Sequence, residues 1–285
     1  MIKNNGEFTR LGAPTSRRNF LKTAGMVSVL ASVSSCAKKE PEYAEAAREL
    51  GFLLADLHVH IDDQLTVRGA LKLSSRRGVK FGLVVHAGAE GLKDDPALLA
   101  YIESLKKHPV FIGIQAEGPD WTKNFSEQAI AQLDFVLTDA LKFPRADGTI
   151  MRLWQPDEVK IPDKQAFMDR YVDYHVDILS HQPIDIIANP TYLPEVLVPE
   201  YDDLWTEARM ERIIDSAVEN DVALEINARY RVPSADFVRL ALAKGAKFSF
   251  GSNYHGEEVG KLDYCIYTAF GCGLEKKDIF IPGQG

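Results

Sequence analysis

The sequence predicts an α/β fold: a closed, slightly irregular β/α barrel of about seven parallel strands. The first reason is that strand-like apolar runs alternate with helical patterns along the chain. The second is that residues 51–285 come close to the ~250 residues of a typical barrel of this kind. The third is that no glycine-rich phosphate loop follows any apolar run, which argues against the alternative, an open doubly wound sheet.

The expected elements follow from local patterns. Strands are expected at 52–57, 81–85, 110–115, 135–138, 184–188, 222–227 and 247–251. Helices are expected at 66–77, 96–107, 126–133, 164–180, 203–219 and 234–244, the last between an N-cap Ser234 and a terminating Gly245. The long link between 140 and 183 begins without periodicity, so it is expected to form a wall of the substrate pocket.

Composition narrows the function. The chain is 46% hydrophobic and 26% charged, which suits a globular core. Its net charge of −8 argues against nucleic acid as a partner, because such partners are bound through phosphate contacts by basic surfaces. Three cysteines cannot make a disulfide framework, and Cys265 and Cys272 are expected to be buried thiols in a terminal helix.

The amino terminus predicts export. Arg17 and Arg18, a short apolar run and Cys36 resemble a twin-arginine signal joined to a lipoprotein cleavage box over residues 1–36. Cys36 would then carry the lipid, and residues 37–50 would form a polar tether. The expected partner is the twin-arginine export machinery, the expected location is the periplasm or cell surface, and the membrane is reached through the lipid anchor alone.

Polar residues occur where the carboxyl ends of the strands are expected, which is where such barrels place their chemistry. His58 and His60 alternate at the end of the first strand and could grip one metal ion, with Asp56 as an acceptor that orients an imidazole. The other candidates at strand ends are His86, Glu117, Asp139, Asn189, Asn227, Asn253 and His255.

The motifs at the two ends of the barrel resemble the PHP family, metal-dependent phosphoesterases named for polymerase and histidinol phosphatase members. Residues 56–60 match its opening Asp-x-His-x-His, and residues 251–255 stand where the family has Gly-Ser-Asp-x-His. The resemblance implies a distorted seven-stranded, TIM-like barrel. Three positions depart from the family: Asp139 and Asn189 replace histidines, and Asn253 replaces an aspartate.

By resemblance, the candidate ligands form three groups for divalent ions, with Zn or Mn expected. The first comprises His58, His60, Glu117 and Asn253; the second Glu117, Asp139 and Asn189; the third His86 and His255. Because Asn is a weaker metal ligand than Asp or His, the first site is expected to be slightly weakened and the second more so.

The resemblance favours a metal-dependent hydrolase of the phosphoesterase type. Asp139 is the expected bridging ligand or general base, and His255 is a second catalytic candidate. Arg229 could bind a small-molecule substrate that carries a phosphate or carboxylate. Two alternatives remain open: an amidohydrolase-like enzyme that cleaves C–N or C–O ester bonds, and a degenerate barrel that binds a ligand without turnover.

Overall fold

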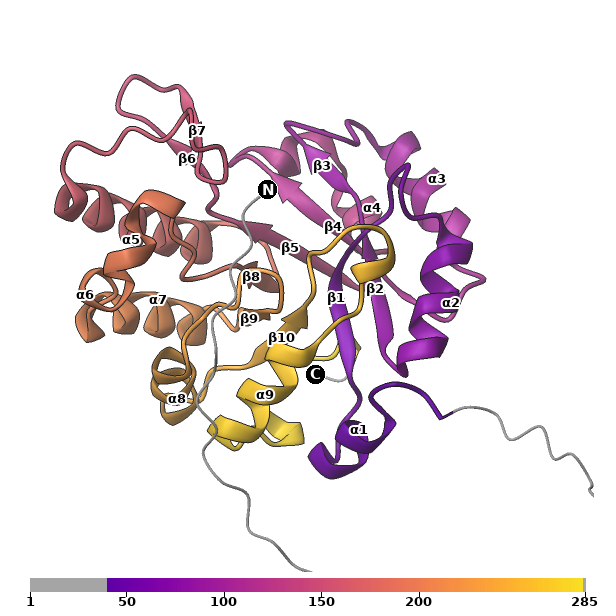
Figure 1. Ribbon diagram of the computed structural model, residues 1–285. Coiled ribbons are helices and arrows are strands. Elements are labelled where there is room, and N and C mark those ends of the chain that lie inside the picture. The colour runs from indigo at the N-terminus through magenta and orange to yellow at the C-terminus, as the bar shows by residue number, and fades with distance from the viewer. Residues whose placement is uncertain (1–39, 284–285) are drawn as a thin grey trace, which may run out of the picture. The chain divides into compact units, whose positions relative to one another are not determined.

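The computed structural model describes residues 40–283 and forms a nearly closed barrel of seven parallel strands surrounded by helices (Figure 1). Around the barrel the order is β1-β2-β4-β5-β8-β9-β10. These strands are β1 (Ala55–His60), β2 (Lys80–Val84), β4 (Phe111–Glu117), β5 (Phe135–Asp139), β8 (Ile186–Ala188), β9 (Ala223–Asn227) and β10 (Phe248–Gly251). The short strand β3 (His86–Gly88) also pairs with β4. Because all of these pairs are parallel, the carboxyl ends of the strands meet at one mouth.

The last gap in the barrel lies between β10 and β1. The backbone N–H of Asn253, just beyond β10, donates to the carbonyl oxygen of His58 over 3.2 Å. Asp56 in β1 accepts a hydrogen bond of 2.8 Å from the backbone N–H of Ser252. These contacts bring the end of β10 against the paired histidines of β1.

Helices follow the strands, as in a right-handed β/α barrel. They are α1 (Ala44–Leu50), α2 (Val67–Arg77), α3 (Asp95–Leu105), α4 (Glu127–Ile130), α5 (Lys164–His181), α6 (Tyr201–Leu204), α7 (Glu207–Glu219), α8 (Ala235–Ala243) and α9 (Asp263–Cys272). Ser234 caps α8 as expected, because its side chain accepts from the backbone N–H of Phe237.

The apolar core has two parts. A small cluster that includes Leu57, Phe135, Leu137 and Ile186 fills the barrel interior, while a larger cluster packs the strands against the helices. A Cβ at Gly82 would lie 2.8 Å from the Phe135 ring, so glycine at this position leaves space for the ring inside the barrel. The interior below the mouth is therefore solid, and chemistry is confined to the mouth.

A β-bulge in β1 aims the histidine pair. Three residue steps from Asp56 to Val59 pair with two steps from Phe81 to Leu83 on β2. Leu57 accordingly belongs to the interior cluster and Val59 to the outer cluster, although simple alternation would give both the same face. Asp56 therefore does not share a face with both histidines, because the bulge interrupts the alternation.

The barrel class is confirmed, and six of the seven expected strands lie close to their predicted positions. The first strand, expected at 52–57, is displaced to Ala55–His60, and the other differences lie in the connections. The expected helix over 203–219 is divided into α6 and α7, and the expected helix over 126–133 is limited to α4. The aperiodic start of the long link contains an antiparallel hairpin, β6 (Lys142–Pro144) and β7 (Ile150–Arg152). Residues 44–50 of the expected tether form α1.

Cys265 is buried and Cys272 half-buried in α9, and both are free thiols. Within residues 40–283, no helix combines the length and apolar character needed to cross a bilayer. The predicted signal and its lipid-bearing Cys36 lie outside the described residues.

Candidate metal and substrate site

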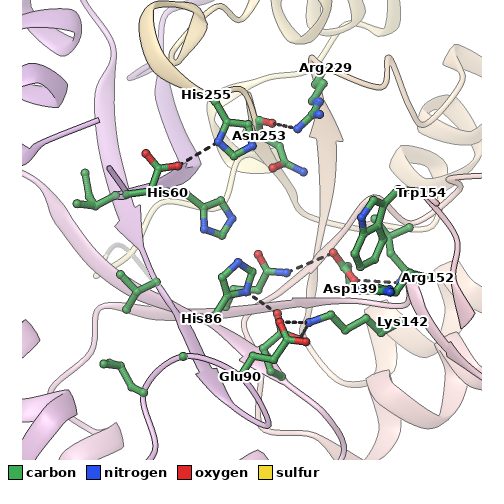
Figure 2. Close-up of a pocket in the computed structure, with 18 of the residues that line it drawn as sticks. His60, His86, Glu90, Asp139, Lys142, Arg152, Trp154, Arg229, Asn253 and His255 are labelled. Carbon is green, nitrogen blue, oxygen red and sulfur yellow. Dashed lines mark hydrogen bonds and ion pairs between the residues drawn. The ribbon is translucent and has the colours of Figure 1, made fainter. Parts of the chain in front are cut away.

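A cleft of about 590 Å³ opens at the carboxyl ends of the strands, which is ample for a small molecule (Figure 2). Six of the predicted residues line it: His60, His86, Glu117, Asp139, Asn253 and His255. Arg229, the predicted substrate-binding residue, also lines it. The long link contributes Lys142, Arg152 and Trp154, so the predicted wall segment does form a wall.

His58 is held by a carboxylate that the sequence did not assign to it. Its Nδ1 lies 2.7 Å from Oε1 of Glu225, and both side chains are about 1% exposed. A hydrogen bond from Nδ1–H to this carboxylate leaves the Nε2 lone pair free. Nε2 is buried and has no hydrogen-bond partner in the described structure. This is the arrangement that carboxylates impose on metal-binding histidines.

Asp56 does not orient an imidazole, contrary to the prediction. Its Oδ1 accepts from the backbone N–H groups of Ser252, at 2.8 Å, and His58, at 3.2 Å. Asp56 therefore fixes the backbone where β1 meets β10, and Glu225 orients the His58 ring. Burial raises the pKa of Asp56 despite these hydrogen bonds.

The His60 ring lies between two other imidazoles. Its centroid is 5.2 Å from that of His58 and 4.7 Å from that of His86, with which it stacks. Burial lowers the pKa of His60 well below its ordinary value, and the neighbouring His58 and His86 act in the same direction. His60 is thus held neutral, the state in which an imidazole can bind a metal ion.

Glu117 ends β4 with both carboxylate oxygens engaged. Oε1 lies 2.5 Å from Nδ1 of His86, and Oε2 lies 2.7 Å from Nζ of Lys142. The same Nζ lies 2.8 Å from Oε2 of Glu90. Burial alone would lower the pKa of Lys142, but its bonds to Glu117 and Glu90 raise it, so the side chain is a fixed cation.

Asp139 ends β5 beside this cation. Its Oδ1 accepts from the backbone N–H of Leu141 at 2.9 Å, and its Oδ2 accepts from the Gln115 amide at 3.4 Å. Burial and the charge of Glu117 raise the pKa of Asp139 to about 6. A carboxyl with this pKa can take up and release a proton near neutrality, as general acid–base catalysis requires.

The two asparagines occupy left-handed backbone positions, with φ of 52° at Asn189 and 45° at Asn253. Asn tolerates this region better than most residues. Asn253 lines the cleft, and its carbonyl oxygen accepts from the Arg229 guanidinium at 3.0 Å. Asn189 is buried outside the cleft lining, and both polar atoms of its amide lack hydrogen-bond partners in the described structure.

His255 lies at the rim of the cleft, and its side chain is half-exposed. Its Nδ1 lies 3.2 Å from Oδ2 of Asp62, a residue in the loop after β1 (Figure 2). His86, the other residue expected in the third metal group, faces Glu117 instead. The third group is therefore divided between two carboxylates.

These donors meet the requirements of one metal ion better than those of two. Among residues 40–283, no group of three or more His, Cys, Asp or Glu side chains is already gathered as a metal site. The neutral His60 and the orphaned, carboxylate-oriented His58 fit a divalent ion in their donor chemistry. The second group fits poorly, because Glu117 is bound to Lys142 and Asn189 offers a neutral amide.

Three polar residues of the site were missed as functional side chains by sequence reasoning. Glu225 lies on β9 beside His58 and was not among the predicted site residues. Gln115 and Lys142 bond Asp139 and Glu117, respectively. A lysine in an aperiodic link gives no local signal of burial, so only the fold could have identified it.

Fold and site together define a distorted β/α barrel with imidazole and carboxylate groups collected at its mouth. A solved structure with this fold is histidinol phosphate phosphatase from Lactococcus lactis subsp. lactis Il1403, complexed with Zn, L-histidinol and phosphate. It matches with a TM-score of 0.55 and 14% identity, over 77% of this chain and 92% of that one. An archaeal ribonuclease P structure with mature tRNA matches at a TM-score of 0.41 and 13% identity, over 78% and 83% of the two chains. No protein-family model and no curated protein matches the sequence.

Proposed function

We propose that this protein is a metal-dependent phosphoesterase that acts on a small phosphate ester. The observation that carries the proposal is the cleft itself, where His60, His86, Glu117 and Asp139 face a rim that bears Arg229. The PHP-like fold supports it, because the histidinol phosphate phosphatase of that fold was crystallised with Zn and phosphate. Zn or Mn is the proposed cofactor.

His58 and His60 would hold the ion, and when bound it would polarise the phosphoryl group and lower the pKa of a water molecule. Glu225 keeps the Nε2 lone pair of His58 available. Asp139, with its pKa raised to about 6, accepts or returns a proton during hydrolysis. Of these groups, His60 and Asp139 line the cleft, whereas His58 and Glu225 are buried beside each other.

Arg229 is the proposed anchor for the anionic part of the substrate. Its guanidinium donates to the Asn253 carbonyl and lies over the Tyr230 ring, 5.2 Å from the ring centroid, so the side chain is placed before a ligand arrives. A guanidinium can bind phosphate oxygens through two parallel hydrogen bonds. Arg231, two residues further on, lies over Tyr264 and outside this cleft, which makes it a matched control.

The test is a panel of chromogenic phosphate, amide and lactone substrates, assayed with added Zn or Mn. We expect turnover of phosphate esters, with KM about 10–150-fold higher in Arg229→Gln and unchanged in Arg231→Gln, because a charge-assisted hydrogen bond is worth about 1.5–3 kcal/mol. Turnover confined to amides or lactones would contradict the phosphoesterase proposal.

A non-catalytic ligand-binding barrel is the second candidate, favoured by the bond between Lys142 and Glu117. It predicts that phosphate or a phosphate monoester binds in calorimetry while no member of the substrate panel is turned over. Turnover that is lost in His58→Ala would exclude it.

We also propose that the protein is exported and anchored by lipid at Cys36. The support is the arginine pair at 17–18 and the short apolar run before the cysteine. Changing both arginines to lysine should retain the precursor in the cytoplasm, and Cys36→Ala should abolish lipid labelling. Unchanged fractionation and labelling in these variants would refute the proposed export and lipid anchoring.

A further inference from the structure

A lysine ammonium lies among the carboxylates where a second metal ion would be expected. Lys142 is the first residue of β6, three positions after the end of β5, and it reaches back across the cleft mouth (Figure 2). Its Nζ lies 2.7 Å from Oε2 of Glu117 and 2.8 Å from Oε2 of Glu90. The contact is sheltered, because the side chain of Glu117 is only 4% exposed and that of Lys142 24%.

The contact with Lys142 compensates the negative charge of Glu117. Glu117 is buried, and a buried carboxylate without a compensating positive charge is costly. In a site with two metals the ions would supply that charge. Here His86 faces one oxygen of Glu117 and Lys142 binds the other, so the chain satisfies both from its own side chains.

The rest of the second donor group agrees with this interpretation. Besides Glu117, the group contains Asp139 and Asn189. Asn189 brings no charge, and its amide makes no hydrogen bond in the described structure. A second dication would have to displace Lys142 from Glu117 and would gain only Asp139 and a neutral oxygen in return.

We propose that the Lys142 ammonium takes the place of the second divalent ion, so that the barrel loads one metal and carries its other positive charge as a protein side chain. The inference rests on the proposed metal site at His58 and His60. An ammonium has three N–H donors, of which Glu117 and Glu90 take two. The third can donate to an anionic substrate.

The experiment counts metal ions per chain after equilibrium dialysis against Zn²⁺ or Mn²⁺, with no activity assay involved. The wild-type protein should hold one ion. Lys142→Met, which removes the charge at similar length, should hold two, whereas Lys142→Arg keeps the charge and should stay at one. Lys93→Met is the matched control: this exposed lysine bonds the Ala89 carbonyl rather than Glu117, and its loss should leave the count at one.

Equal counts in wild-type and Lys142→Met, or two ions in the wild-type protein, would overturn the inference. Should Lys142→Met fail to fold, judged by circular dichroism, Lys142→Gln takes its place with the same expected count of two. A wild-type count of zero would refute the proposed metal site. The gain of one ion in the charge-removing variant would still support the role of Lys142, so the two failures can be told apart.

Discussion

Glu225→Gln is the substitution that most sharply tests how the barrel prepares His58. Oε1 of Glu225 faces Nδ1 of His58 at 2.7 Å, while Oε2 accepts from the backbone N–H of Asn189 at 2.9 Å and from the Asn227 amide at 3.0 Å. Glutamine has almost the same shape but only one acceptor oxygen. That oxygen must face the two donors, so its NH₂ group must face His58.

An NH₂ group beside Nδ1 reverses the imidazole tautomer. Nδ1 must then accept the hydrogen bond, and the proton moves to Nε2, whose lone pair is no longer available to a metal ion. Loss of such an orienting partner typically weakens metal affinity by about 10–100-fold, which corresponds to about 1.4–2.7 kcal/mol. The variant should therefore bind Zn²⁺ that much more weakly while it remains folded.

Competition with a chromophoric zinc chelator measures this change directly. Asp185→Asn is the matched control, since Asp185 accepts from the Val136 backbone near the opposite ends of the strands. Its affinity for zinc should equal that of the wild-type protein. If Glu225→Gln binds zinc as tightly as the wild-type protein does, the proposed orientation of His58 is wrong.

Three further outcomes are expected. Burial lowers the pKa of His175 to about 4, so as the pH falls below 6.5 the unfolded chain takes up a proton on this side chain before the folded protein does. The free energy of unfolding should therefore be unaffected by this group above pH 6.5 and should fall by about 3 kcal/mol by pH 4. Denaturant titrations should show a flatter pH dependence of stability in His175→Leu. Gly251→Ala places a Cβ against the carboxylate of Glu225, so it should lower the free energy of unfolding in urea by about 1–3 kcal/mol and should also weaken metal binding. Gly271→Ala is the control: its Cβ meets open space, and it should change neither stability nor metal affinity. Asn253→Asp combined with Asn189→His should tighten metal binding, although the count stays at one ion while Lys142 is present; equal affinity in parent and double variant would show that these asparagines do not govern loading.

The barrel was predictable because its signals are local. Strands buried on both faces leave apolar runs in the sequence, and helices leave caps such as Ser234. β9 keeps the alternation that a regular strand requires: Ala223 belongs to the interior cluster, while Leu224 and Ile226 pack toward the helices. The bulge in β1 was not predictable, because it depends on the register with β2.

The site was predictable in its residue types and less so in its partnerships. The histidines and Glu117 could be found because parallel topology collects strand ends at one mouth. That Glu225 holds His58, or that Lys142 reaches Glu117, depends on contacts between residues 167 and 25 positions apart. The β6–β7 hairpin that carries Lys142 has no alternating apolar pattern. Lys142 could therefore be assigned to the predicted wall of the pocket, but its bond to Glu117 could not be predicted.

The most direct test of the central claim is elemental analysis of the protein purified without chelator, beside His58→Ala prepared in the same way. A metal site built on His58 and His60 predicts at least one tightly held Zn or Mn per wild-type chain. It also predicts loss of that metal in His58→Ala with circular dichroism unchanged, because strand–helix packing sustains the barrel. Wild-type protein without bound metal, or a His58→Ala variant with its metal retained, would contradict the account.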